Sequence, residues 1–537
     1  MDLLSNLPDR IHEILKEGAK KGDTRVAITD ELGNDWSYAR MISTVDRVAT
    51  EMSELGIRAG DRVMIVCENS VAAIILMYAA SQLDAWAVTT NARLSEREIA
   101  LIEHDSQPRR VFYTSLVSPD ADVHATNAAA ETLHMSGIGE VKVGKMNESA
   151  APEKVYEDAA KQVAVLIYTT GTTGRPKGVM LSHRNLLYVA CRGQRMKTLF
   201  AEDVAWCVMP ISHSYGLVLL QGLLFAGGRL KIMPRFDVEK TLDAVASGEV
   251  TILNAVPALL NRVIAHVEKN NLTMTPNSLR YVYSGTAPLD LSLRQKVENI
   301  FDVVLHNGYG LTETSPTISR TIYEKGTGEI NIGTPIPGVT VKVVGANGNE
   351  VGQGESGELL VKGPNVMLGY YGQPELTRDV IDADGYLRTG DLVSLNEMGE
   401  ITIQGRSKEL IIRSGFNVYP QEVEAALNAH DAVLNAAVIG VPVEGNEEII
   451  AFVELVPGGA VEPAELSAFI ENTLAQYKRP QRIVVLPQLP MAPNGKIRKH
   501  ELKKFAQQSP IEDGPGILAS VAPQSDFPSI EVGSGSR

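Results

Sequence analysis

Apolar runs with the composition of β-strands alternate with helical patterns through residues 61–115. The runs at 61–67, 85–91 and 109–115 predict buried strands, and the patterns at 70–84 and 95–105 predict helices between them. The second helix opens on a capping box, with Ser as the cap and Glu three residues later. Strands and helices in this order predict a parallel sheet covered by helices.

The same pattern returns later in the chain. A β-branched run at 163–169 predicts a strand, and residues 182–196 predict a helix capped by Ser182. Three further apolar runs end in turns, at 250–257, 279–285 and 303–310, and the last two of these turns contain Gly. Ligands of open α/β sheets bind at the carboxyl ends of strands, so these turns are expected to converge on one crevice.

Past residue 340 the pattern changes to short strands separated by Asn-Gly and Gly turns, which indicates antiparallel β structure. Residues 406–507 predict a small α+β unit of their own. The last stretch, 509–537, is rich in Ser, Pro and Gly and has no periodicity, so we expect a disordered tail. A chain of 537 residues is too long for one core, which agrees with two or three domains.

The charge and cysteine content exclude several classes of protein. The formal net charge is −15, which argues against nucleic acid or anionic lipid as the main partner. Three Cys cannot form a disulfide framework. No apolar run reaches about 18 residues, and the amphipathic N-terminus carries acids unlike a signal peptide, so we expect no integral membrane segment and a cytoplasmic protein.

One stretch, YTTGTTGRPKGV at 168–179, is suited to holding phosphate. Backbone N–H groups in Gly-rich turns form concave anion sites, the Thr hydroxyls add donors, and Lys177 adds a charge. The stretch does not match the phosphate loop GxxxxGK[ST], because its Lys follows Pro176 and precedes a Gly. The candidate phosphate-binding residues are Thr169, Thr170, Gly171, Thr172, Thr173, Gly174 and Lys177.

A second stretch, HNGYGLTET at 306–314, collects groups that suit a nucleotide. Asn307 offers an amide, Tyr309 an aromatic face, Thr312 a hydroxyl and Glu313 a carboxylate. A single carboxylate suffices for Mg²⁺ that also binds substrate phosphates. Taken alone, the Asp391 of RTGDL (388–392) is an ordinary turn residue, although its carboxylate could accept both hydroxyls of a ribose.

Seven motifs occur in a fixed order: YTTGTTGRPKGV, PISHSYG, SGTAP, NGYGLTE, YLRTGDL, GRSKELI and PNGKI. Together they resemble the acyl- and aryl-CoA ligases of the adenylate-forming superfamily, over about residues 30 to 505. The resemblance implies an α/β fold in which a large domain of doubly wound parallel sheets with a β-rich subdomain (1–404) precedes a hinge (405–408). A small mobile α+β domain (409–508) follows the hinge.

The resemblance also implies two half-reactions, with ATP, Mg²⁺ and coenzyme A. A carboxylate attacks the α-phosphate of ATP to form an acyl-adenylate and pyrophosphate, and the thiol of coenzyme A then displaces AMP. By position, Lys496 would supply the positive charge of the first step, while Glu313 would hold Mg²⁺ and Thr312 would contact phosphate. The expected nucleotide site further includes Gly285, Thr286, Ala287, Pro288, Asn307, Gly308, Tyr309, Gly310, Asp391 and Arg406.

His213 matches a family position between the acyl and thioester sites, where it would orient or shield the carboxylate; a buried structural His is the alternative. In the mobile domain, Lys408 matches the hinge, and Ser414, Gly415 and Phe416 would lie beside coenzyme A. The sequence departs from the plant-type ligases at Ile412, where those carry a Lys.

The acyl pocket is expected to be lined by small or apolar groups, at His213, Ser214, Tyr215, Leu219, Gly285, Gly308 and Ser315. Malonate-type relatives carry an Arg where this chain has Gly308, which argues against a dicarboxylate because an unpaired buried carboxylate is costly. Residues 210–222 hold no acid for an amino group. We therefore expect a small-molecule acid that is apolar, either medium-to-long-chain aliphatic or aromatic.

Three alternatives remain at this point. The enzyme could load a carrier protein instead of coenzyme A, it could be a P-loop NTPase, or it could be an inactive binding protein. The missing GK[ST] argues against the second, and the presence together of Lys177, Glu313, Asp391, Arg406 and Lys496 argues against the third. The sequence is compatible with a monomer or a homodimer.

Overall fold

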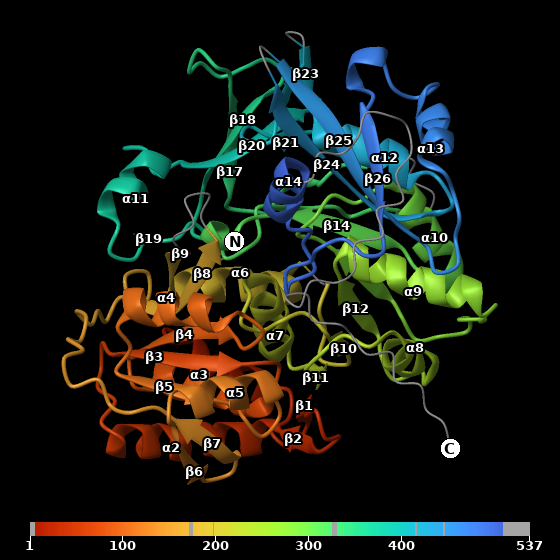
Figure 1. Cartoon of the computed structure of the whole chain (residues 1–537). Helices are drawn as coiled ribbons and strands as arrows, with labels where there is room; N and C mark the ends of the chain where they lie inside the picture. Colours follow the sequence, from red (N-terminus) through yellow and green to blue (C-terminus); the bar gives the residue numbers. More distant parts are fainter. Residues whose placement is uncertain are drawn as a thin grey trace. The chain divides into compact units, whose positions relative to one another are not determined.

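The computed structural model describes residues 6–170, 176–196, 198–324, 330–413, 416–443 and 446–508. The chain forms two compact units (Figure 1). The larger comprises Met1–Lys408 together with Met491–Lys496, and the smaller comprises Glu409–Pro490 and the chain from Ile497 onward. The segment 491–496 therefore belongs to the larger unit, although it lies inside the range expected for the small domain.

An eight-stranded sheet in the larger unit is built on the predicted alternation of strands and helices. Its strand order is β19-β9-β8-β4-β3-β5-β7-β6, and the four strands from β8 to β5 are parallel. Antiparallel strands extend the sheet at both edges. The strands are β3 (Arg62–Cys67), β4 (Trp86–Asn91), β5 (Arg110–Tyr113), β6 (Glu131–Met135), β7 (Gly139–Val143), β8 (Val163–Thr170), β9 (Pro176–Ser182) and β19 (Gly369–Tyr370).

Serine side chains cap three helices of the larger unit, and two of these caps, Ser95 and Ser182, were predicted. The hydroxyl of Ser70 accepts from the third residue of α3 (Val71–Gln82), and Ser95 and Glu98 form the capping box of α4 (Glu96–Ser106). Ser182 caps α6 (His183–Arg195) in the same way. The predictions of strand and helix between residues 61 and 115 are confirmed, with boundaries shifted by one or two residues.

A nine-stranded sheet forms the second half of the larger unit, in the order β16-β15-β14-β13-β12-β10-β11-β1-β2. The six central strands, β14, β13, β12, β10, β11 and β1, are parallel to one another. The strands β2, β15 and β16 pair antiparallel at the two edges. The strands are β1 (Val26–Thr29), β2 (Asp35–Ser37), β10 (Val204–Cys207), β11 (Arg229–Ile232), β12 (Ile252–Ala255), β13 (Tyr281–Ser284), β14 (Leu305–Tyr309), β15 (Ser319–Arg320) and β16 (Thr334–Pro335).

Helices between the two sheets share one hydrophobic core with strands of both. Buried side chains of α6 and α7 (Ser214–Ala226) belong to the same cluster as Val63, Val165 and Leu230 of three strands. The helix α7 is buried on nearly all sides, as its continuous apolar composition predicts. The other helices of the two sheet layers are η1 (Ile11–Glu13), α1 (Ile14–Ala19), α2 (Tyr38–Glu54), α5 (Pro119–Asn127), α8 (Val238–Ala246), α9 (Pro257–Lys269) and α10 (Leu291–Phe301).

The β-rich part of the larger unit is a four-stranded antiparallel sheet in the order β17-β18-β20-β21. It confirms the antiparallel structure predicted past residue 340. Its elements are β17 (Thr340–Val344), β18 (Gly357–Lys362), α11 (Pro374–Val380), β20 (Leu387–Leu395) and β21 (Ile401–Arg406).

The smaller unit has its own α+β core. Its three-stranded sheet pairs β24 antiparallel and β26 parallel with the central β25, and a two-stranded β22-β23 ribbon precedes it. The half-buried Lys499 forms ion pairs with Glu409 and Glu424 within this unit. The elements are β22 (Ile411–Arg413), β23 (Phe416–Val418), α12 (Pro420–Asn428), β24 (Val433–Val443), β25 (Asn446–Leu455), α13 (Pro463–Ile470), η3 (Gln476–Lys478), β26 (Arg482–Leu486) and α14 (Lys499–Gln508).

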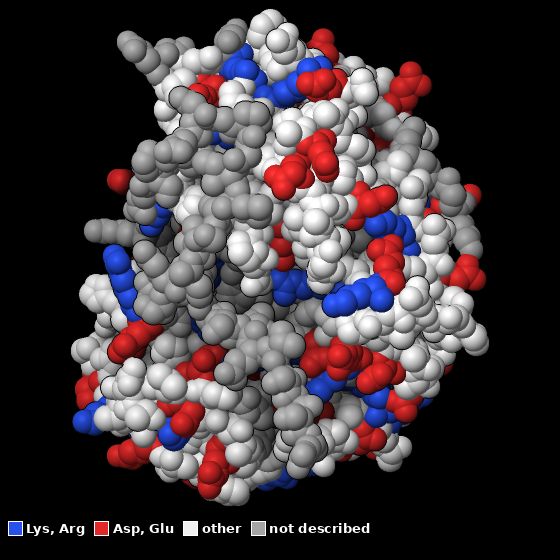
Figure 2. Space-filling view, turned by 45° about the vertical axis from the view of Figure 1, so that its right-hand side comes forward, with Lys and Arg blue, Asp and Glu red and all other residues white. Residues whose placement is uncertain are grey.

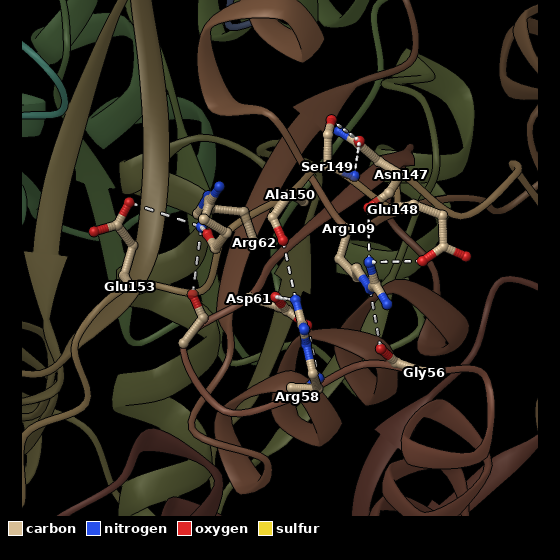
Figure 3. A network of polar contacts seen from close by, with 12 residues as sticks. Gly56, Arg58, Asp61, Arg62, Arg109, Asn147, Glu148, Ser149, Ala150 and Glu153 are labelled. Carbon is tan, nitrogen blue, oxygen red and sulfur yellow. Dashed lines mark hydrogen bonds and ion pairs between the residues drawn. The ribbon is translucent and has the colours of Figure 1, made fainter.

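Arginines hold the irregular segment that leads into β8 against the edge of the first sheet (Figure 3). Arg58 donates to the carbonyl of Ala150, and Arg109 donates to that of Asn147. Arg62 is 3% exposed and donates to Ala151 O at 2.7 Å. Guanidinium groups that bond several carbonyls fix the path of a segment without regular structure. These bonds fix the path of residues 147–151, ahead of β8.

Acidic and basic side chains are interspersed on the face of the molecule in Figure 2. Among the described residues, no helix is long and apolar enough to cross a bilayer.

Candidate active site

Three parallel strands of the nine-stranded sheet, β12, β13 and β14, end at the same edge. The turn after β13 carries Gly285, Thr286, Ala287 and Pro288, and it packs closely on β14. A Cβ at Gly285 would lie 3.3 Å from the carbonyl oxygen of Gly308. Thr286 has φ +71°, and its hydroxyl is buried without a hydrogen-bond partner among the described residues. A buried donor of this kind fits a ligand that the turn would hold.

Asp391 lies at the centre of a second group of residues. Its carboxylate accepts a hydrogen bond from the hydroxyl of Tyr309, at the end of β14, and one from Arg406 Nε at 3.0 Å. Asp391 and Arg406 are cross-strand neighbours on β20 and β21. Burial raises the pKa of Asp391, while Arg406, the Tyr309 hydroxyl and Lys496 act in the opposite direction. The carboxylate is therefore held by two hydrogen-bonding groups from separate motifs, Tyr309 and Arg406.

Asn307 precedes this group on β14 and is buried. Its amide donates to the carbonyl of Asn331 at 3.1 Å, and its Oδ1 accepts from the N–H of Gly308. A Cβ at Gly310 would lie 1.4 Å from the carbonyl oxygen of Pro316, so the backbone after Tyr309 tolerates no side chain there.

Glu313, in the short helix η2 (Thr312–Thr314), is held by Tyr370 of β19. The Tyr370 hydroxyl donates to Glu313 Oε1 at 2.8 Å, and burial together with the charge of Glu313 raises the pKa of Tyr370. Lys177 lies over the same ring, with its Nζ 5.2 Å from the centroid. The structure thus brings a carboxylate to the hydroxyl and a cation to the ring face of one aromatic residue that the sequence did not single out.

The Gly/Thr stretch joins the paired strands β8 and β9. Thr169 pairs with Lys177 and Thr170 with Pro176 across the hairpin. The predicted phosphate-binding residues Gly171, Thr172, Thr173 and Gly174 lie outside the described residues.

His213 is the N-terminal cap of α7 and is half-buried. Burial and the charge of Lys496 lower its pKa to about 4, so the imidazole is neutral at pH 7. The side-chain nitrogen of Asn494 lies 2.9 Å from His213 Nε2. Because an amide nitrogen can only donate, Nε2 accepts and the ring proton resides on Nδ1. That Nδ1 is buried and has no hydrogen-bond partner in the described part of the chain.

Lys496 follows a tight turn that is anchored to the larger unit. Gly495 has φ +79° and donates to Ala492 O at 2.8 Å, while Arg93 donates to Pro493 O at 3.2 Å. A Cβ at Gly495 would lie 2.5 Å from Val256 Cγ2. The charge of Lys496 lowers the pKa of both His213 and Asp391, so its ammonium group lies near both side chains.

The residues predicted for the acyl pocket gather around α7. Ser214 Oγ lies 3.4 Å from Thr312 Oγ1, and the Tyr215 hydroxyl donates to Tyr283 O at 3.1 Å. A Cβ at Gly308 would lie 1.6 Å from the hydroxyl oxygen of Tyr283, so this tyrosine takes the space beside the glycine.

Leu219 is buried on the same helix. Ser315 is also buried, but its hydroxyl donates to the carbonyl of Asn365 at 2.9 Å. Its polar group therefore serves the fold of the turn in this structure.

The residues predicted beside coenzyme A are described in part. Ser414 and Gly415 lie outside the described residues, and Phe416 is 55% exposed and stacks on Tyr477 with centroids 4.7 Å apart. Arg413 donates to the carbonyls of Tyr477 and Arg479. Lys408 is the last residue of the larger unit before the chain enters the smaller one.

Three residues of the site were not predicted: Tyr370, Asn494 and Tyr283. Asn494 stands inside the PNGKI motif, so the motif itself was a signal. The two tyrosines contact Glu313 and Gly308 from strands that are distant in sequence. Among the described residues, no group of three or more His, Cys, Asp or Glu could hold a metal ion. One carboxylate, at Glu313, fits a Mg²⁺ that takes its other ligands from phosphate and water.

The chain matches a known family at both of its parts. Residues 15–371 match the AMP-binding enzymes, and residues 422–496 match the C-terminal domain of AMP-binding enzymes. The chain is 33% identical over 522 residues to 4-coumarate–CoA ligase 5 of Oryza sativa subsp. japonica, which covers 93% of this chain and 95% of the relative.

Solved structures agree. ATP-bound MatB from Rhodopseudomonas palustris has a TM-score of 0.79 at 29% identity, over 92% of this chain and 99% of the other. O-succinylbenzoate coenzyme A synthetase (MenE) from Bacillus subtilis, in complex with ATP and magnesium ion, has a TM-score of 0.76 at 26% identity, over 91% and 99%. With the family match over both units, these relatives show that the chain belongs to the adenylate-forming AMP-binding enzymes and is an AMP-forming acid–CoA ligase.

Proposed function

We propose that this ligase activates an apolar carboxylic acid, aromatic or medium-to-long-chain aliphatic, as its acyl-adenylate and transfers the acyl group to coenzyme A. The observation that carries the proposal is the position of Lys496, whose charge acts on both Asp391 and His213. A cation near both Asp391 and His213 offsets the charge of one anion that attacks another.

On the nucleotide side, Asp391 and Arg406 bind the ribose hydroxyls of ATP. The turn of Gly285, Thr286, Ala287 and Pro288 and the ring of Tyr309 enclose the adenine. Asn307 lies at the edge of the base, and Gly308 and Gly310 allow the backbone to approach the nucleotide. The buried, unpartnered hydroxyl of Thr286 supports this assignment.

The phosphates are held on the other side of Tyr309. Thr169, Thr170 and Lys177, with the loop between them, steady the β- and γ-phosphates as they leave together as pyrophosphate. Thr312 contacts phosphate, and Glu313 holds Mg²⁺, which would neutralise phosphate charge. The hydrogen bond from Tyr370 to Glu313 supports a carboxylate that is oriented before any cation binds.

In the first half-reaction a carboxylate oxygen of the acid attacks the α-phosphorus, and the bond from that phosphorus to the pyrophosphate oxygen breaks. Lys496 offsets the charge that the two anions bring together. The Nδ1–H of His213 donates to the acid carboxylate and so orients it. In the second half-reaction the coenzyme A thiol, after losing its proton, attacks the acyl carbon and AMP departs.

For the second step we propose that Ser414, Gly415 and Phe416 lie beside coenzyme A once the smaller unit has rotated about Lys408. A carrier protein is the alternative thiol acceptor. We also propose a cytoplasmic enzyme that acts as a monomer or homodimer.

The acid lies among Ser214, Tyr215, Leu219, Gly308 and Ser315 in this proposal. Tyr283 fills the space at Gly308, so a short dicarboxylate finds no cation at that position. The relationship to 4-coumarate–CoA ligases supports an aromatic acid.

The experiment is a panel of aromatic and aliphatic acids, scored by AMP release with coenzyme A, with a carrier protein, and with neither. AMP release that depends on an apolar acid and on coenzyme A supports the proposal. ADP release, or AMP release with the carrier protein alone, contradicts it.

A further inference from the structure

Two arginines near α6 have buried donors without acceptors. Arg192, on α6, is 4% exposed, and its Nε, Nη1 and Nη2 are buried and have no hydrogen-bond partner among the described residues. Arg320, on β15, donates from Nη1 to Thr198 Oγ1 at 3.0 Å, while its Nε and Nη2 are buried and lack partners in the same part of the chain. Buried cations are normally paired, so this arrangement calls for an acceptor.

Neighbouring arginines show the usual arrangement. Arg280 lies in an ion pair with Asp203, and Arg294 forms one with Glu298 at 2.9 Å. No such pair is found for Arg192 or Arg320 among the residues that the structure describes. The guanidinium of Arg192 instead lies over the ring of Tyr188, 4.1 Å from its centroid. An aromatic face offsets part of a charge but accepts none of the in-plane N–H groups.

Thr198 links the Arg320 side chain to the end of α6, one residue after Arg192. The Thr198 N–H and hydroxyl both bond the carbonyl of Gly193, the residue after Arg192, and the same hydroxyl accepts from Arg320. A Cβ at Gly338 would lie 3.4 Å from Arg192 Nη2. The absence of a side chain at Gly338 therefore leaves space beside this guanidinium group.

The same region adjoins the proposed acyl pocket. Val189 of α6 belongs to a buried cluster against which Val218 of α7 packs, and Val218 also packs against the cluster that holds Tyr215. Burial raises the pKa of Tyr283, and the charge of Arg320 opposes this rise, so Arg320 lies near the tyrosine that contacts Gly308.

Gln221 adds a third polar side chain in this region. It lies one and a half turns after Tyr215 on α7, which packs along α6. It is fully buried, and neither its amide nitrogen nor its amide oxygen has a partner in the described residues.

We propose that Arg192 and Arg320, with Gln221, form an anion-binding subsite at the far end of the acyl pocket, and that the preferred acid carries a second carboxylate remote from the reacting one. This subsite rests on the proposed function and refines it. The body of the acid is apolar, and its far end is anionic. Malonate would need a cation beside the reacting carboxylate, and Gly308 on β14 supplies none. In this proposal a longer acid extends instead to Arg192 on α6.

The test compares matched acids that differ only at the far end: nonanoate with nonanedioate, and cinnamate with 4-carboxycinnamate. kcat/KM for AMP release with coenzyme A is measured for each acid. The wild type is expected to favour the diacid of each pair by about tenfold or more, because a site built to bond a polar group rejects the analogue that lacks it. In Arg192→Met and Arg320→Met this preference is expected to fall at least about tenfold.

Arg280→Met serves as the matched control, because it removes a nearby arginine that already has Asp203 as a partner. In Arg280→Met the ratio of kcat/KM for the diacid to kcat/KM for the monoacid is expected to equal the wild-type ratio. The wild-type comparison stands even where a variant does not fold. A wild-type preference for the monoacids, or for the ω-hydroxy acid over the diacid, overturns the subsite and leaves the ligase function intact. Absence of AMP release with every acid overturns the proposed function and the subsite with it.

Discussion

The hydrogen bond from Tyr370 to Glu313 makes a prediction about Mg²⁺. Tyr370→Phe removes only the hydroxyl that donates to Glu313. The ring is buried, so packing in β19 keeps its position. A hydrogen bond to a charged group contributes about 1.5–3 kcal/mol, which corresponds to a roughly 10- to 100-fold change in an equilibrium constant. Groups that orient metal ligands have effects of about the same size. We therefore expect the Mg²⁺ concentration at half-maximal activity to rise about tenfold or more.

The assay is a Mg²⁺ titration of acid-dependent pyrophosphate exchange, which follows the first half-reaction alone. Tyr371→Phe is the matched control, since the neighbouring Tyr371 also donates to a carboxylate, Glu153 Oε1, at 2.9 Å. Both variants lose a phenol-to-carboxylate bond, so their losses of thermal stability should be similar. A Mg²⁺ titration that is unchanged in Tyr370→Phe, or shifted equally in both variants, refutes the role of Glu313 as the Mg²⁺ ligand that Tyr370 orients.

Three further results are expected. Lys496→Ala should lower pyrophosphate exchange by about 10²- to 10³-fold, while thioester formation from supplied acyl-adenylate survives; exchange near the wild-type rate would contradict the assignment. His213 has a folded pKa of about 4 against 6.5 unfolded, so the unfolded chain binds its proton first and stability is lost as pH falls below 6.5. Between pH 6.5 and 5 the free energy of unfolding, measured by chemical denaturation, should therefore fall by about 2 kcal/mol less in His213→Asn than in the wild type. Gly308→Ala places a Cβ 1.6 Å from the Tyr283 hydroxyl and should cost about 1–3 kcal/mol; in thermal denaturation, Tyr283→Phe should recover part of this loss.

Local signals in the sequence predicted most of the elements. Ser95 with Glu98, and Ser182, mark helix starts that the structure confirms, because a capping side chain and the N–H it bonds are only three residues apart. The carboxyl ends of β13 and β14 likewise follow from apolar runs that end in glycine. Segment 491–496 could not be assigned in this way. Its contacts are with Arg93 and His213, which are hundreds of residues away.

The two sides of the site differ in how far the sequence can describe them. The nucleotide side depends on backbone conformation within short motifs, such as the turn at Gly285 and the close approach at Gly310, and a motif of five residues specifies such a shape. The acyl side, as proposed, depends on side chains from α6, α7, β13 and β15, which are separated in sequence and are brought together only by folding.

Gly308 belongs to both sides, and it shows why one position cannot define the acid. Its lack of a side chain admits the Tyr283 hydroxyl, so the identity of residue 308 constrains residue 283 and the reverse. A cation missing at 308 can then be supplied from α6 or β15 without any change in the nucleotide motifs. Acid specificity in this fold can therefore change through packing partners while the adenylation chemistry is retained, and the acid must be inferred from the whole lining and not from the motif position alone.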